Sequence, residues 1–228
     1  MKDMTKKNKG KLILGIDEAG RGPVVGPLVI AGALFEEKNI QKLKDIGVKD
    51  SKLLPAKKRE SLFGTIKNFS VNYKIIKVST QEIDQRFSVN TNLNQLEAIK
   101  FAEIINELKP DIAIIDTPSR NTAAFKRYLW KFLKHKCELQ CENFADLNHV
   151  EVGAASILAK VVRDNEIKKI EKEVGEEIGV GYPSDPMTIN FVKKALKNKK
   201  WLEHIRKTWF TFQRIKGEKE QKTIMEWD

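Results

Sequence analysis

Apolar residues along this chain fall into short runs of strand length, separated by longer segments in which they recur at helical spacing. The runs that predict β-strands are Lys11–Ala19, Pro27–Phe35, Val71–Val78, Asp111–Asp116 and Cys137–Phe144. Between Leu28 and Leu34 the sequence is almost continuously apolar, which predicts a central strand that is covered on both faces. A short glycine-rich turn separates the first two strands, and this favours their antiparallel pairing.

The segments between and after these strands predict helices. They are Pro55–Asn68, 92–109, Thr122–Lys134, Val150–Val174, Met187–Lys197 and Trp201–Ile205. The second ends before Pro110, because the residue that precedes a proline disfavours helical geometry. The helix Val150–Val174 begins with small residues, which let it approach its neighbours closely. From Arg163 onward most of its residues are charged, and we expect that part to be exposed. The tail from Lys216 is expected to fray. This order of elements predicts an α/β protein with a mixed sheet.

Four carboxylates stand beside loop signals at the ends of predicted elements: Asp17, Glu18, Asp116 and Asp146. Buried carboxylates are costly unless they are paired or bind a cation. A set of carboxylates with no nearby cysteine and few histidines suits Mg²⁺ or Mn²⁺ rather than zinc. Taken singly, however, an aspartate at a strand end is more often a turn former or a helix N-cap than a metal ligand.

The loop Gly20-Arg21-Gly22 directly follows the first two acids. Glycine permits positive φ and lets backbone N–H groups approach a ligand closely. The dinucleotide-binding fingerprint does not fit, because Pro23 intervenes and Gly26 comes one position late. Backbone amides in such a loop can read a 2′-hydroxyl, the group that separates RNA from DNA. The same residues also serve as an ordinary turn between strands.

Composition narrows the class of partner. The chain has 228 residues and a formal net charge of +11, which indicates one domain, or one domain with a small appendage, and an anionic partner. Nucleic acid is favoured over a membrane surface, although well-solvated lysine-rich faces would give the same charge. Cys137 and Cys141 form no zinc pattern and indicate a reducing compartment. Because no apolar run has the length of a signal peptide or a membrane span, we expect a cytoplasmic protein.

The segment Gly15-Ile16-Asp17-Glu18-Ala19-Gly20-Arg21-Gly22-Pro23 closely resembles the opening signature of ribonuclease HII. Two further segments carry the resemblance, Ala154–Lys160 and Gly181–Pro186, and it extends from Leu14 to about Trp209. It is closer to the archaeal and eukaryotic branch than to the common bacterial form. The resemblance implies a ribonuclease H-like, mixed five-stranded sheet flanked by helices. The cluster of glycine and proline over Gly179–Pro186 marks a boundary, which predicts a catalytic domain over 11–185 and a small helical C-terminal extension over 186–228.

What the resemblance implies about chemistry is specific. Asp17, Glu18, Asp116 and Asp146 would be the catalytic residues and would hold two Mg²⁺ or Mn²⁺ ions. The enzyme would hydrolyse the RNA strand of RNA/DNA hybrids and incise duplex DNA 5′ of single ribonucleotides, leaving a 3′-hydroxyl and a 5′-phosphate. Such an activity belongs to ribonucleotide excision repair and DNA replication.

The resemblance also implies substrate contacts. Gly20, Arg21 and Gly22 would read the 2′-hydroxyl, and Tyr182 would stack on the sugar just past the RNA–DNA junction. The candidate phosphate contacts, each of which is also interpretable as a solvated surface cation, are Lys52, Lys160, Arg163, Arg206 and Lys207. Trp201 and Trp209 are interpreted as packing residues of the C-terminal helices.

The sequence also leaves other functions and partners to consider. A junction resolvase also uses clustered acids, but a nuclease for DNA alone has no use for the Gly20–Gly22 loop and Tyr182. A binding module with a decayed site is disfavoured because all four acids are present. The related ribonuclease HIII carries a substantial N-terminal domain, whereas only a short tail precedes the motif here. We expect a monomer, and a replication sliding clamp is a candidate partner, although the C-terminal tail shows no clear clamp-binding box.

Overall fold

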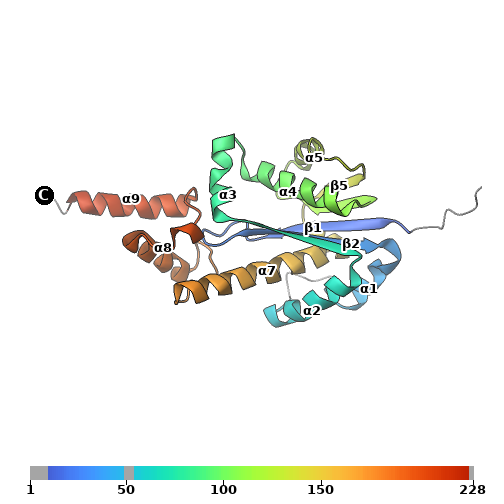
Figure 1. Ribbon diagram of the computed structural model, residues 1–228, viewed down its shortest axis with the longest axis horizontal. Helices are drawn as coiled ribbons and strands as arrows, with labels where there is room; N and C mark the ends of the chain where they lie inside the picture. The colour runs from blue at the N-terminus through green and yellow to red at the C-terminus, as the bar shows by residue number, and fades with distance from the viewer. Residues whose placement is uncertain (1–9, 49–53, 226–228) are drawn as a thin grey trace, which may run out of the picture. The chain divides into compact units, whose positions relative to one another are not determined.

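A five-stranded β-sheet organises the chain, in the strand order β3-β2-β1-β4-β5. The computed structural model describes residues 10–48 and 54–225 (Figure 1). The strands are β1 Leu12–Ala19, β2 Leu28–Glu36, β3 Asn72–Val78, β4 Ile112–Asp116 and β5 Glu138–Glu142. β4 pairs in parallel with both β1 and β5. β2 is buried from Leu28 to Phe35, as its continuous apolar run predicts. The predicted mixed sheet is confirmed.

Helices make up much of the rest of the described chain. They are α1 Ile40–Asp45, α2 Ala56–Phe69, α3 Thr80–Gln85, α4 Leu93–Leu108, α5 Thr122–Trp130, α6 Ala145–Asn148, α7 Val150–Val174, α8 Pro186–Asn198 and α9 Phe210–Met225, with 3₁₀ turns η1 Glu37–Asn39, η3 Arg86–Val89 and η4 Leu202–His204. α4 ends where predicted, because Lys109 adopts a left-handed φ of 51° before Pro110. The C-terminal segment differs from expectation: it is helical from Phe210 to Met225 instead of fraying from Lys216. α3 lies in a segment for which the apolar pattern predicts no element.

The chain folds as two compact units that interleave along the sequence. The first contains the described parts of Met1–Glu18, Ile30–Ile76 and Asn94–Val161. The second contains those of Ala19–Val29, Lys77–Leu93 and Val162–Asp228. The division into domains between residues 185 and 186 stays a prediction.

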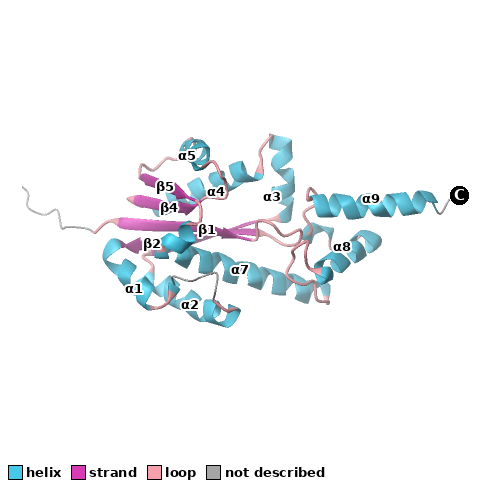
Figure 2. Cartoon of the chain, turned by 180° about the vertical axis from the view of Figure 1, so that it is seen from behind, coloured by secondary structure: helices cyan, strands magenta, loops and turns pink. Residues whose placement is uncertain are grey.

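Helices cover both faces of the sheet in the first unit. Figures 1 and 2 show α4 and α5 on one side of the strands, with α1 and α2 on the other. Two glycines set how closely the helices approach. A Cβ on Gly32 would lie 2.4 Å from the Ile104 side chain of α4, whereas one on Gly15 would lie 2.2 Å from the backbone carbonyl of Glu151 in α7. The start of α7 thus packs directly on β1, as its small residues predict.

The glycine at the β1–α7 contact yields a testable contrast. We expect Gly15→Ala to lower the free energy of unfolding by about 1–3 kcal/mol or more, because its Cβ meets the helix backbone rather than a movable side chain. Gly64→Ala is the matched control: Gly64 is exposed within α2 and has open space around its Cβ position. There, alanine should raise stability by about 0.5–1 kcal/mol. Urea denaturation measures both; equal stability of Gly15→Ala and wild type would contradict the close approach.

The second unit has its own apolar core. Val24 and Val25 pack with α7 residues such as Ile167, and with residues of α8 and α9. Trp201 stacks on Phe191 with the ring centroids 6.1 Å apart. Trp201 and Trp209 both pack against this cluster, so their predicted packing role is confirmed.

Candidate active site

Three of the four predicted acids come together in the first unit. Asp17 lies near the carboxyl end of β1 and Asp116 at that of β4, and Asp146 lies in the short helix α6. β1 and β4 run in parallel with Ile16 opposite Ile115, so the next residue of each strand is the aspartate. One carboxylate oxygen from each of the three aspartates lies within 4.8 Å of the others. The carboxyl ends of neighbouring parallel strands are where α/β proteins bind ligands.

The path of the chain after β5 brings Asp146 to this edge. Phe144 adopts a left-handed φ of 59° and turns the backbone into α6. The Ala145 N–H donates to the Asp116 carboxylate at 3.3 Å, which ties the start of α6 to the end of β4. Asp146 is therefore held beside Asp116, with only 1 % of its surface exposed.

Burial strongly perturbs Asp17. The pKa of the Asp17 carboxyl is raised to about 7, mainly by burial and also by the neighbouring Asp116 charge. The Ser156 hydroxyl, the Glu18 N–H at 2.7 Å and the Lys160 ammonium act in the opposite direction. Ser156 and Lys160 come from consecutive turns of α7. Sequence reasoning missed Ser156, whose only signal is its position one turn before Lys160 on a helix of small residues.

The donor set fits a hard divalent cation. Three carboxylates within 4.8 Å of one another, two of them almost fully buried, repel each other and are poorly solvated. A divalent cation offsets both costs, and oxygen ligands are those that Mg²⁺ and Mn²⁺ prefer. Asp17, Asp116 and Asp146 are thus the residues that could hold a metal.

Three other predicted residues have different outcomes. Glu18 is half-buried and is not a member of the three-acid group; adjacent strand residues point to opposite faces, and its role as a ligand stays a prediction. Lys160 lies close enough to Asp17 to lower its pKa, so it is near the acids. Lys52 lies outside the described residues.

The predicted substrate loop and tyrosine come together in the second unit. Gly20 has a φ of +84°, and a Cβ there would lie 2.8 Å from the Pro27 carbonyl, so the loop requires glycine at this position. A Cβ on Gly22 would lie 3.4 Å from the Tyr182 ring, which places that ring against the loop. The Tyr182 side chain is 40 % exposed and so retains an accessible surface.

Two predicted phosphate contacts are instead buried. Arg163, in the stretch of α7 that we expected to be exposed, is 5 % exposed and donates to the Val180 carbonyl at 2.8 Å. Its guanidinium carbon lies 5.7 Å from the centre of the Tyr182 ring. Arg206 is fully buried. Neither is a surface cation, because each bonds backbone carbonyls; Lys207 is exposed and remains a candidate.

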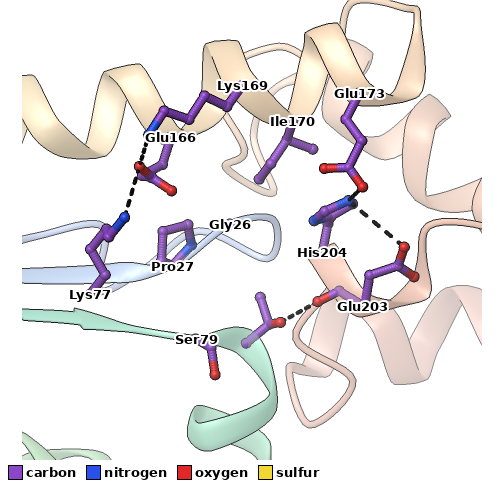
Figure 3. Close-up of a pocket in the computed structure, with 11 residues that line it drawn as sticks. Gly26, Pro27, Lys77, Ser79, Glu166, Lys169, Ile170, Glu173, Glu203 and His204 are labelled. Atoms are coloured by element: carbon purple, nitrogen blue, oxygen red, sulfur yellow. Dashed lines mark hydrogen bonds and ion pairs between the residues drawn. The ribbon is translucent and has the colours of Figure 1, made fainter.

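A pocket of about 330 Å³ lies elsewhere in the second unit (Figure 3). Glu166 on α7 bridges Lys77 and Lys169 there, at 3.3 and 2.7 Å. Across the pocket, Glu173, Glu203 and His204 form the other group with metal-ligand spacing among the described residues. His204 already faces both glutamates, at 3.3 and 3.9 Å, and both glutamates are exposed, so this group shows none of the burial of the three aspartates.

Comparison with known proteins agrees with this geometry. The sheet, its flanking helices and the buried acids define a metal-dependent ribonuclease H. The sequence model of one family, ribonuclease HII, matches residues 14–213. The chain belongs to the ribonuclease HII family, whose members cleave the RNA strand of RNA/DNA hybrids. Within the described part of the chain, no helix combines the length and the apolar character that a bilayer crossing requires.

Similar proteins are mostly archaeal. Ribonuclease HII of Methanocella arvoryzae is 44 % identical over 206 residues, which cover 90 % of this chain and 92 % of that protein. That of Pyrococcus furiosus is 43 % identical and covers 92 % and 95 %. The crystal structure of ribonuclease H2 from Pyrococcus horikoshii matches with a TM-score of 0.84 and 40 % identity, over 91 % of this chain and 98 % of that one. A ribonuclease HIII crystallised with Mn²⁺ is 21 % identical and shows only the shared fold.

The three-acid group predicts a metal-dependent gain in stability. We expect saturating Mn²⁺ to raise the melting temperature of the protein by on the order of 5 °C, because an ion that binds only the folded state stabilises it. Asp146→Asn should remove most of this shift, measured by differential scanning fluorimetry. Glu173→Gln, in the exposed group, is the control and should retain it. The reverse pattern would place the tighter metal site at the exposed group.

Proposed function

We propose that this chain incises duplex DNA 5′ of a single embedded ribonucleotide, in addition to the hybrid cleavage of its family. The observation that carries the proposal is the packing of the Gly20–Gly22 loop against the partly exposed Tyr182 ring. A nuclease that needed only a continuous hybrid would not require a feature that singles out one sugar. The loop also follows the Asp17-Glu18 pair directly in the chain.

The acids are proposed to supply the hydrolytic chemistry. Asp17, Asp116 and Asp146, with Glu18, would hold two divalent cations, Mg²⁺ or Mn²⁺. When bound, such ions lower the pKa of the attacking water and offset the charge on the departing 3′-oxygen. The cleavage leaves a 3′-hydroxyl and a 5′-phosphate. Lys160, which is close enough to Asp17 to lower its pKa, would contact a phosphate oxygen of the substrate.

The loop and the tyrosine are proposed to supply the specificity. A 2′-hydroxyl both donates and accepts hydrogen bonds, so backbone groups of Gly20, Arg21 and Gly22 can recognise it where a deoxyribose offers nothing. The aromatic face of Tyr182 can hold the next nucleotide without reading its base. Ribonucleotides of any base would then be recognised.

A protein partner is proposed from a similar protein. A ribonuclease HII from Archaeoglobus fulgidus, 35 % identical with a TM-score of 0.81 over 89 % of this chain and 96 % of that one, was solved in complex with PCNA, a sliding clamp. We propose that this chain also binds a sliding clamp and acts in ribonucleotide excision repair and DNA replication. The monomeric state and the cytoplasmic location stay predictions.

Cleavage of a labelled DNA duplex that carries one ribonucleotide tests the proposal. We expect incision on its 5′ side with Mg²⁺ or Mn²⁺ and none with a chelator. Cutting of long hybrids without incision at the single ribonucleotide would refute the junction specificity. Failure to cut either substrate would favour a binding module that has lost its activity.

A further inference from the structure

We propose that Arg206 and Trp209 are positioning residues that hold the Gly20–Gly22 loop by its carbonyl oxygens, so that its N–H groups face the substrate. This inference rests on the proposed function, because it explains how the loop could recognise a 2′-hydroxyl. Neither residue is proposed to touch the substrate.

The buried guanidinium of Arg206 bonds the Gly20–Gly22 loop through two of its nitrogens and Gly26 through the third. Nη2 donates to the Gly20 carbonyl at 2.6 Å, Nη1 to the Arg21 carbonyl at 2.9 Å and Nε to the Gly26 carbonyl at 3.0 Å. The side chain is fully buried. Burial of a cation is costly, and these charge-assisted bonds to carbonyl oxygens offset that cost. The fork of donors is particular to arginine, since a lysine ammonium offers a single nitrogen.

Trp209 holds the third carbonyl of the loop, and Arg206 and Trp209 together form what we call the clamp. Its indole Nε1 donates to the Gly22 carbonyl at 3.1 Å, and its ring lies 4.8 Å from the Arg206 guanidinium carbon. The carbonyls of Gly20, Arg21 and Gly22 are thus all held by these two side chains.

The segment that carries both residues is itself fixed. The Arg206 N–H donates to the Val24 carbonyl at 2.9 Å, next to the bridge between Val25 and Ile205. On the other side, the Asp84 carboxylate accepts the N–H groups of Lys207 and Thr208 at 2.8 and 3.0 Å. The segment is therefore anchored to Asp84 of α3 and to Val24 and Val25, which follow the loop in the chain.

The geometry of the peptide bond converts these carbonyl contacts into an orientation of donors. In a trans peptide, the C=O of one residue and the N–H of the next point in opposite directions. Fixing the Gly20 and Arg21 carbonyls on Arg206 therefore directs the N–H groups of Arg21 and Gly22 away from it. The Gly22 carbonyl precedes Pro23, which has no N–H, so the Trp209 bond secures the end of the loop and orients no donor.

The test compares the affinity for two duplexes that differ by one 2′-hydroxyl, within each variant. Binding is measured on an Asp17→Asn background, which blocks cleavage, and the ratio of the two dissociation constants cancels any loss of folded protein. Arg206→Lys should lower this ratio by about 10-fold or more, because two or three buried carbonyls lose their donors. Trp209→Phe, which keeps the ring but removes one hydrogen bond, should lower it by about 3-fold.

Trp201→Phe is the matched control, since Trp201 packs on the same apolar cluster and, among the described residues, makes no hydrogen bond to the loop carbonyls. It should keep the wild-type ratio. A wild-type ratio of one would refute 2′-hydroxyl reading, and with it the proposed function. If the wild type discriminates and Trp209→Phe discriminates equally well, the clamp is wrong while the proposed function stands. An equal loss in Trp201→Phe and Trp209→Phe would also overturn the clamp, because the effect would then come from packing on the shared apolar cluster and not from the hydrogen bond to the loop.

Discussion

Asp17→Asn is expected to abolish cleavage while leaving a folded protein that still binds hybrid. Asparagine keeps the size of the side chain but removes one of the three carboxylates that lie within 4.8 Å of one another. Loss of a group that only supports a metal ligand costs about 10–100-fold, so loss of a ligand should cost at least about 100-fold in rate. A single-turnover assay on a long RNA/DNA hybrid measures this, and wild-type cleavage by the variant would refute the metal assignment.

The same substitution should stabilise the metal-free protein. The pKa of Asp17 is raised to about 7, from an ordinary value of 3.8, so the folded state holds a proton that the unfolded state releases. The stability lost to this carboxylate therefore grows as pH rises from about 3.8 and is complete above about 7. A neutral asparagine avoids that loss.

We therefore expect the melting temperature of metal-free Asp17→Asn to exceed that of the wild type at pH 8, with the difference shrinking towards pH 4. Thermal denaturation in the presence of a chelator measures it. A variant less stable than wild type at pH 8 would show that the carboxylate makes net favourable contacts without metal. With the expected gain in stability, activity and stability are opposed at this position, as is common where an active site concentrates charge.

Tyr182→Ala is expected to have the second large effect, on duplex DNA with a single ribonucleotide. The ring is 40 % exposed and lies against Gly22, so its removal deletes a stacking surface and leaves the loop without support on that side. Stacking of a nucleotide on an aromatic ring contributes about 1–3 kcal/mol, which corresponds to a loss of about 5–150-fold in kcat/KM.

Tyr182→Phe is the matched control. It keeps the ring and removes only the hydroxyl, so it should retain most of the wild-type activity if stacking is the role. The rate of incision of the single-ribonucleotide duplex, measured under steady-state conditions, distinguishes the two variants. An unchanged rate in Tyr182→Ala would count against stacking, and an equal loss in Tyr182→Phe would point to the hydroxyl.

The sequence by itself determined the strands and most helices, because period-2 and period-3.6 apolar patterns report which faces are buried. It also placed each acid at the end of an element. The 25-residue helix α7, with its small first half, follows directly from its composition. The left-handed turn that ends α4 before Pro110 is likewise a local effect.

Only the tertiary structure decided which of these residues meet. Asp17 and Asp116 are neighbours because β1 and β4 pair in parallel in one register, and Asp146 joins them through a turn at Phe144. Pairing of distant strands depends on the whole core and leaves no local signal. The period of a strand already indicates that Asp17 and Glu18 point to opposite faces, but the sequence does not say which neighbours each of them meets.

Arg163 and Arg206 show most clearly the limit of what the sequence can predict. In the sequence, Arg163 lies in a charged stretch and Arg206 beside Lys207, and both are typical of solvated cations. In the folded chain both are buried, and each donates to backbone carbonyls of other segments, Arg163 to Val180 and Arg206 to Gly20. Whether a cation faces solvent or a loop is decided by which carbonyls the fold leaves without a partner, and that is a property of the assembled chain alone.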